Sequence, residues 1–125
     1  MTTASGFPAD APGIPQPAST PEDLRAAMAL LAPEALGTFD TERAVALRQA
    51  REQVSAAPMR RFVGQWAVRV AIERHPGRAA RLRALEARAA EVDDLDEARA
   101  IAAEIGAIID AATVEAGVRQ EQSGL

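Results

Sequence analysis

MRRFVGQWAVRVAIERHPGRAARLR, residues 59–83, decides the fold, because it contains a predicted helix that is apolar on two sides. At 100° per residue, one stripe of this helix places Trp66, the only tryptophan, between Phe62 and Val70. A second stripe lies on nearly the opposite side and consists of Gly64, Val68, Ala71 and Ile72. Such a helix is either the centre of a bundle or keeps one side for a partner, and the sequence leaves both possibilities open.

The composition of the whole chain favours an all-α protein. Alanine, leucine, glutamate and arginine, all strong helix formers, dominate its 125 residues, which suffice for one domain. The chain has no cysteine, which excludes disulfides and thiol chemistry. It has neither an apolar run near the ~18 residues of a membrane span nor the apolar core of a signal peptide. We therefore expect a cytoplasmic protein with no membrane contact.

Helix start and stop signals divide the chain. Thr20 followed by proline and two acids predicts an N-cap, and Asp94 with Glu97 predicts another. Gly117 is a typical helix stop. The predicted helices cover residues 21–31, 33–55 or 38–55, 58–74, 78–92 and 95–116. We expect a bundle of four to five helices over residues 20–117, a disordered Pro/Ala-rich tail over residues 1–19 and a C-terminal tail over residues 118–125.

Within this frame, short loops predict that the last three helices are successive antiparallel neighbours. The second helix is expected to bury one apolar face, made by Leu36, Phe39, Leu47, Ala50 and Val54.

Charge is unevenly distributed. Residues 58–90 hold eight arginines and two acids, whereas residues 91–125 hold nine acids and two arginines. One hypothesis is internal: Arg81 or Arg88 pairs with acids of the last helix, as exposed ion pairs worth ~0–1 kcal/mol each. A second is a protein interface, in which that helix covers a basic partner through Asp96, Glu97 and Glu104 while the second stripe anchors a dimer or partner.

A third hypothesis is nucleic-acid binding through a helix–turn–helix-like hairpin that uses Arg78, Arg81, Arg83 and Arg88. The outward face of that hairpin lacks Asn, Gln, Ser and Thr for reading bases, and the whole chain is acidic, with a net charge of −4.

The sequence does not assemble the groups of an enzyme active site. His75, the only histidine, stands at a predicted helix end, where a cation suits the helix dipole. The acidic run at 93–97 lacks the spacing of a calcium loop, and there is no glycine-rich phosphate loop. We therefore predict no catalytic activity, no cofactor and no metal.

Two segments, PEDLRAAMALLAPEALGTFDTERAVALRQA and APMRRFVGQWAVRVAIERHP, carry a family likeness over residues 20–76. They are similar to small actinobacterial helical proteins that form a family of uncharacterised function. The matching positions are Leu24, Arg25, Ala26, Ala27, Pro33, Glu34, Phe39, Asp40, Glu42, Ala57, Pro58, Trp66, Val70, Ala71, Arg74 and Pro76. This chain has Arg43 where the family often has an aromatic residue. The resemblance implies a helical accessory protein with an antitoxin-like role.

These observations predict a non-enzymatic protein-binding module, antitoxin-like, that covers a small basic partner and forms a homo-oligomer. Two alternatives stay open. One is a small DNA-binding regulator, and the other is a structural homo-oligomeric subunit in which both stripes of the central helix are buried.

Overall fold

The computed structural model of this protein describes residues 13–124, with side chains described as far as residue 117. These residues form five α-helices and one short 3-10 helix, and none of them lies in a β-strand. The prediction of an all-α fold is confirmed. The elements are α1 Pro21–Leu31, η2 Pro33–Ala35, α2 Leu36–Gln53, α3 Ala57–Glu73, α4 Pro76–Ala89 and α5 Leu95–Gly124.

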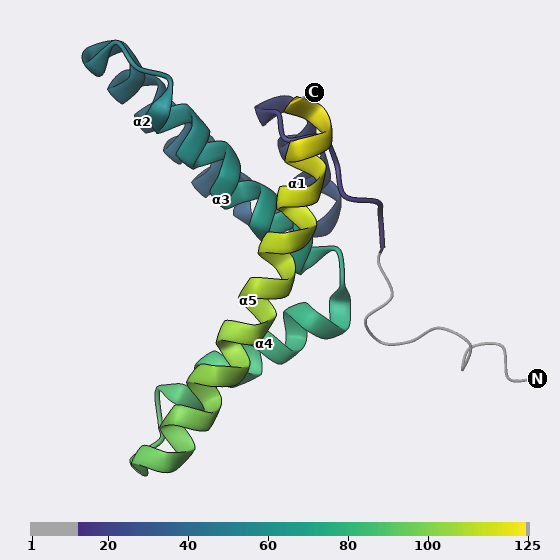
Figure 1. Cartoon of the computed structure of the whole chain (residues 1–125), viewed down its shortest axis with the longest axis vertical. Helices are drawn as coiled ribbons and strands as arrows, with labels where there is room; N and C mark the ends of the chain where they lie inside the picture. The colour runs from purple at the N-terminus through teal and green to yellow at the C-terminus, as the bar shows by residue number, and fades with distance from the viewer. Residues whose placement is uncertain (1–12, 125) are drawn as a thin grey trace, which may run out of the picture.

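The helices form two hairpins, and α3 is the central helix that contacts all the other α-helices. In Figure 1, α2 and α3 make one hairpin, whose tip points to the upper left, and α4 and α5 make a second, whose turn lies at the bottom. The long helix α5 crosses α3. Contacts join α3 to each of the other four α-helices. The helix that is apolar on two sides is therefore the central helix of the fold.

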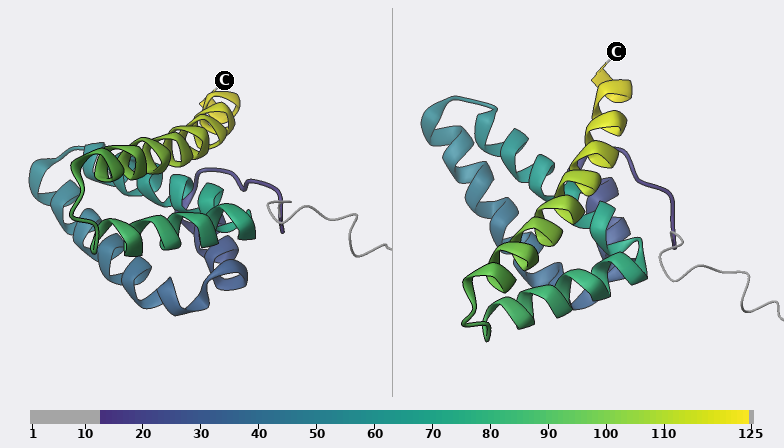
Figure 2. Two further views of the ribbon diagram at one scale, coloured as in Figure 1. Left: turned by 90° about the horizontal axis from the view of Figure 1, so that it is seen from below. Right: turned by 60° about the horizontal axis from the view of Figure 1, so that its bottom comes forward.

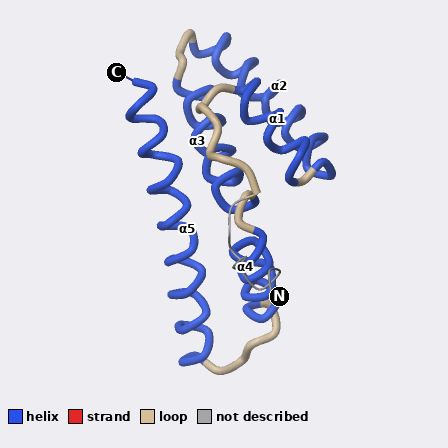
Figure 3. The backbone as a smooth tube through the Cα atoms, turned by 90° about the vertical axis from the view of Figure 1, so that its right-hand side faces the viewer, coloured by secondary structure: helices blue, strands red, loops and turns tan. Residues whose placement is uncertain are grey.

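The helix α5 is long enough to lie along both α3 and α4. Its 30 residues span about 45 Å at 1.5 Å per residue, close to the combined length of α3 and α4, which have 17 and 14 residues. Figure 3 shows α3 and α4 following one another along one side of α5, with α1 and α2 beyond α3. The right-hand view of Figure 2 shows that α3 and α4 meet at a corner. They are not the antiparallel pair that the short loop predicted.

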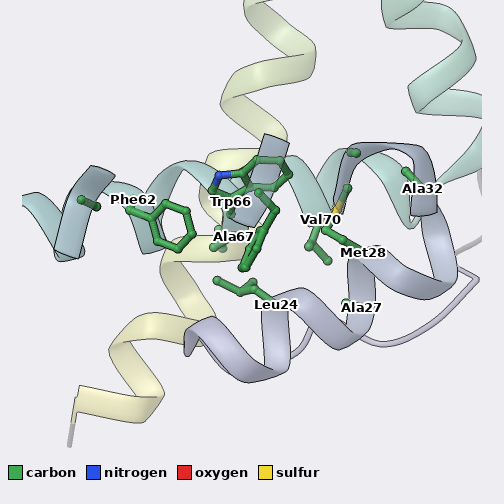
Figure 4. Close-up of a cluster of buried hydrophobic side chains, with 12 residues drawn as sticks. Leu24, Ala27, Met28, Ala32, Phe62, Trp66, Ala67 and Val70 are labelled. Atoms are coloured by element: carbon green, nitrogen blue, oxygen red, sulfur yellow. The ribbon is translucent and has the colours of Figure 1, made fainter. Parts of the chain in front are cut away.

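The larger core cluster lies where α1 and α2 pack on α3. The Phe39 ring stands edge-on to both Phe62 and Trp66, with centroids 5.0 Å apart in each pair. From α1, Leu24 and Met28 are fully buried, and Figure 4 shows them facing Trp66 and the rest of the first stripe of α3. Burying each such side chain contributes roughly 1.5–3 kcal/mol. Trp66 is 4% exposed and is one of the large side chains of this core.

Residues before α1 also pack on this core. Gly13 donates its backbone N–H to the carbonyl of Arg74 at 2.6 Å, and the Gln16 side chain donates to the carbonyl of Ala67 at 3.0 Å. Ile14 packs against the larger cluster. The tail expected over residues 1–19 therefore does not include residues 13–19, which run along α3. Residues 1–12 lie outside the described residues.

Two helix ends differ from the sequence-based prediction. The helix α2 ends at Gln53, and Val54 takes a left-handed conformation and is 91% exposed, although we expected it on the buried face. At the other end of the chain, α5 continues through Gly117 to Gly124, although a stop at Gly117 was expected. No described glycine has a positive φ, so Gly117 does not adopt the conformation that ends a helix. The predicted C-terminal tail is helical as far as residue 124.

Over residues 13–124, no helix combines the length and apolar character that a membrane crossing needs.

Candidate interaction surfaces

The second stripe of α3 is covered by the chain itself. Ala71 is fully buried and Ile72 is 8% exposed, and both pack with Ala79 of α4 and Ala112 of α5. Val68 is half-buried beside the same cluster. These residues are core, so they do not form the exposed partner surface that we expected. Small side chains at this crossing let three helices approach closely.

Gly64, the fourth member of that stripe, is not a site of close helix approach. A Cβ atom added there would meet no atom within 4 Å. Within the described part of the chain, no other helix therefore packs closely against α3 at this glycine.

The charges of α4 and α5 pair with each other. Arg81 binds Glu104 at 2.6 Å, and Arg88 binds Glu97 at 2.6 Å. The hypothesis of internal pairing is therefore confirmed. The third predicted acid, Asp96, is 92% exposed and lies 3.8 Å from Arg99.

The two remaining candidate arginines are also paired. Arg83 binds Glu73 at 2.7 Å, and Arg69 binds the same carboxylate at 2.8 Å. The Glu73 side chain is 8% exposed. Arg78 binds Glu115 at 2.7 Å. All four arginines predicted to meet nucleic acid thus have carboxylate partners within the chain.

Glu115 of α5 holds the turn between α3 and α4. Its carboxylate binds Arg74 and Arg78 at 2.7 Å each and the His75 imidazole at 3.1 Å, and all four side chains are at least three-quarters buried. Burial raises the pKa of Glu115, but hydrogen bonds from Arg78, Arg74 and His75 outweigh it, so that the pKa lies below its ordinary value. This cluster ties α5 to the corner of the fold.

Ion pairs also join α1 to α2. Arg25 donates two hydrogen bonds of 2.8 Å to Asp40, and Arg43 donates one of 2.8 Å to Glu22. The Arg25 hydrogen bond lowers the pKa of Asp40. Arg43, which stands where the family often has an aromatic residue, therefore forms an ion pair with Glu22.

Four arginines have no carboxylate partner, and they gather at one place. Arg48 and Arg51 lie near the end of α2, and Arg60 and Arg61 lie near the start of α3. All four are exposed, and no ion pair or hydrogen bond joins their side chains to another described residue. The other nine arginines with described side chains each lie within 4.0 Å of a carboxylate. We call this group the arginine tip.

Sequence reasoning missed the arginine tip as a site. Arg60 and Arg61 stand in the same basic block as the arginines of α4, so charge alone did not distinguish them. One available signal was local: Glu52 is the only acid among residues 44–65.

A groove of about 290 Å³ lies beside the arginine tip, between α2 and α3. Its buried members are Ala46, Pro58 and Phe62, which give it an apolar floor. Its exposed members are mostly polar: Thr41, Glu42, Gln49, Arg61 and Gln65. Among these, Glu42 accepts a hydrogen bond of 2.9 Å from the Trp66 indole N–H. The groove therefore combines an apolar base with free hydrogen-bonding groups.

The opposite end of the molecule is acidic. The turn from α4 into α5, residues 91–96, contains four acids and no basic residue, and its Leu95 is 62% exposed. Asp94 caps α5 by accepting the Glu97 N–H at 2.8 Å, as predicted. We call residues 91–96 the acidic turn. In the part of the chain that the structure describes, no group of three or more His, Cys, Asp or Glu side chains is placed to hold a metal ion.

Comparison with known proteins gives a family and no closer relative. No curated protein and no solved structure matches this chain. A family of unknown function, DUF6247, matches residues 12–112, from the packed segment before α1 to the second half of α5. The match covers most of the chain and confirms the resemblance to a family of uncharacterised function. The chain therefore belongs to the DUF6247 family.

Proposed function

We propose that this chain is a non-enzymatic protein-binding module whose binding surface is the arginine tip with the adjoining groove. The observation that carries the proposal is the distribution of ion pairs. Nine arginines are neutralised within the chain, whereas the four of the arginine tip point their charge at solvent. Guanidinium groups bind carboxylates through paired hydrogen bonds, so this surface suits an acidic partner.

The groove favours a protein over a nucleic acid. Phe62 and Pro58 give an apolar floor that can receive a side chain, while Gln49 and Gln65 can each donate to and accept from a peptide backbone. The chain as a whole is acidic, whereas nucleic-acid-binding domains are typically basic.

The other hypotheses have less support. An antitoxin-like α5 that covers a basic partner would have to release Glu97 and Glu104 from Arg88 and Arg81. A DNA-binding regulator that uses the arginines of α4 would have to break the same pairs. The arginine tip requires no such exchange.

The test measures binding of the full chain to a set of immobilised peptides of equal length and graded net charge. We expect binding to increase with negative peptide charge and to weaken with salt, because exposed charges are screened beyond about 8 Å at physiological ionic strength. Arg61→Glu should weaken it. Arg99→Glu, which changes the charge equally at the far end of the molecule, should not.

Equal binding of acidic and basic peptides, or equal effects of the two variants, would overturn the proposal. A labelled DNA duplex and a single-stranded RNA serve as further probes. Tighter binding of either than of the acidic peptides, lost in Arg61→Glu, would replace the protein partner with a nucleic acid.

A further inference from the structure

We infer that the arginine tip of one copy receives the acidic turn of a second copy, so that the chain associates head to tail. This inference rests on the proposed function, and it names the partner as the chain itself. It begins from the two ends of the molecule, which carry opposite charge that the fold does not neutralise.

The acidic turn carries exposed carboxylates and an exposed apolar side chain, which complement the arginine tip and the groove. Asp93 and Glu91 are exposed and bind no described cation, and Asp96 is 92% exposed. Between them Leu95 exposes 62% of its surface, although it is a large apolar residue. An apolar side chain flanked by carboxylates complements an apolar groove flanked by arginines.

The two surfaces cannot meet within one copy. Figures 1 and 3 both show the tip of the α2–α3 hairpin and the turn between α4 and α5 at opposite ends of the molecule. Neither α4 nor α5 contacts α2 among the described residues. Contact between the tip and the turn therefore requires a second copy.

The docked arrangement follows from the residues that are free. Leu95 would enter the groove over Phe62 and Pro58, and Asp93 and Asp96 would bind Arg48 and Arg61. Asp94 would stay with α5, because its side chain already caps that helix. No ion pair of the folded chain has to break except the 3.8 Å contact between Asp96 and Arg99.

Such an interface joins different surfaces of the two copies, so each added copy leaves one tip and one turn free. Association therefore continues into chains or closes into a ring. Because its ion pairs are exposed, the association should be weak and salt-sensitive. It should increase with protein concentration and disappear at high salt.

The experiment is sedimentation velocity over a concentration series at low and high salt, with two double variants of the full chain. A tip variant carries Arg48→Glu and Arg61→Glu, and a turn variant carries Asp93→Arg and Asp96→Arg. All four positions are exposed, so both variants should fold, which circular dichroism checks. In each variant alone, the association constant should fall by about tenfold or more.

A mixture of the two variants gives the sharpest result. The tip variant still has an intact turn, and the turn variant has an intact tip, so these two surfaces can pair. The two altered surfaces also carry opposite charge, with carboxylates on the tip and guanidinium groups on the turn. The mixture should therefore recover the association that neither variant shows alone. Asp110→Arg, an exposed acid of α5 outside both surfaces, should associate like the wild type.

Three results would overturn the inference: a wild type that stays monomeric, association that both variants retain, or a mixture that does not pair. Failure of the proposed function has a different signature. If the wild type is monomeric but acidic peptides still bind and Arg61→Glu abolishes their binding, only self-association fails. If acidic peptides do not bind either, the proposed function fails as well.

Discussion

Val54 is the only non-glycine residue among those described with a positive φ, at φ 49° and ψ 54°. A β-branched side chain is crowded in this left-handed conformation, at roughly 1–2 kcal/mol. Because its side chain is 91% exposed, burial does not offset the strain. The residue follows Arg51 by three positions, so the strained backbone belongs to the arginine tip, and strain of this kind gathers at functional sites.

Val54→Gly should therefore stabilise the fold. Glycine adopts the left-handed conformation without steric cost but gains freedom in the unfolded chain, so we expect a net increase of about 0.5–1 kcal/mol in the free energy of unfolding. Urea denaturation measures it. Val54→Ala keeps the Cβ atom, so its free energy of unfolding should rise clearly less. Equal stability of the two variants would show that the backbone at this residue is not strained.

At the scale of the helix, two interior glycines leave space for a methyl group. A Cβ atom at Gly64 of α3 or Gly106 of α5 would meet nothing within 4 Å. Alanine has a higher helix propensity than glycine, so Gly64→Ala and Gly106→Ala should each raise the free energy of unfolding by about 0.5–1 kcal/mol. Thermal unfolding of the two variants checks this.

Ala71 provides the contrast within the same stripe. It is fully buried against α4 and α5, so Ala71→Leu should overpack this crossing and lower stability by about 1–3 kcal/mol. If Gly64→Ala were instead destabilising, another chain would have to approach α3 at that glycine in solution.

Helix starts could be predicted from the sequence because their signals are local. Thr20 accepts the Asp23 N–H at 3.1 Å, and Asp94 accepts the Glu97 N–H at 2.8 Å, each across three residues. The end of α5 could not be predicted in this way. Ala116 is buried in the larger core cluster, so tertiary packing holds the helix past Gly117, whose stop signal is only a local preference.

The burial of the second stripe of α3 could be predicted only as one of two possibilities. The pattern of Val68, Ala71 and Ile72 shows that this side is apolar, but not which surface covers it. Both α4 and α5 form that surface, through Ala79 and Ala112, and Ala112 lies about forty residues further along the chain. Periodicity therefore showed that this helix is apolar on two sides, but not whether the chain itself or a partner covers the second side.

At the scale of the whole molecule, the site depends on which cations remain free. Arg81 and Glu104 are 23 residues apart, and Arg74 and Glu115 are 41 apart, so sequence alone does not determine such pairs. The course of α5 determines them, because it passes along α4 but not past the tip of the α2–α3 hairpin. The arginine tip is therefore a property of the fold, although each of its residues is visible in the sequence.

The Glu115 cluster makes the stability of the whole molecule depend on pH. The pKa of Glu115 is lower in the folded chain than its ordinary value, so the folded state binds fewer protons than the unfolded state in that range. Its contribution is complete above the ordinary glutamate pKa of about 4.3 and is lost as the pH falls through the lowered folded value. Asp40 and Glu22, whose pKa values are also lowered, act in the same direction.

Glu115→Gln tests this contribution. At neutral pH it should lower the free energy of unfolding by about 1–3 kcal/mol, because Arg74 and Arg78 lose their shared carboxylate in a site that is largely buried. The difference from the wild type, followed by urea denaturation from neutral pH down to about pH 3, should shrink once the wild-type carboxylate is protonated. Glu34→Gln, which removes an exposed acid without an ion pair, should leave neutral stability unchanged. A difference that stayed constant down to pH 3 would mean that Glu115 acts through its shape and hydrogen bonds rather than through its charge.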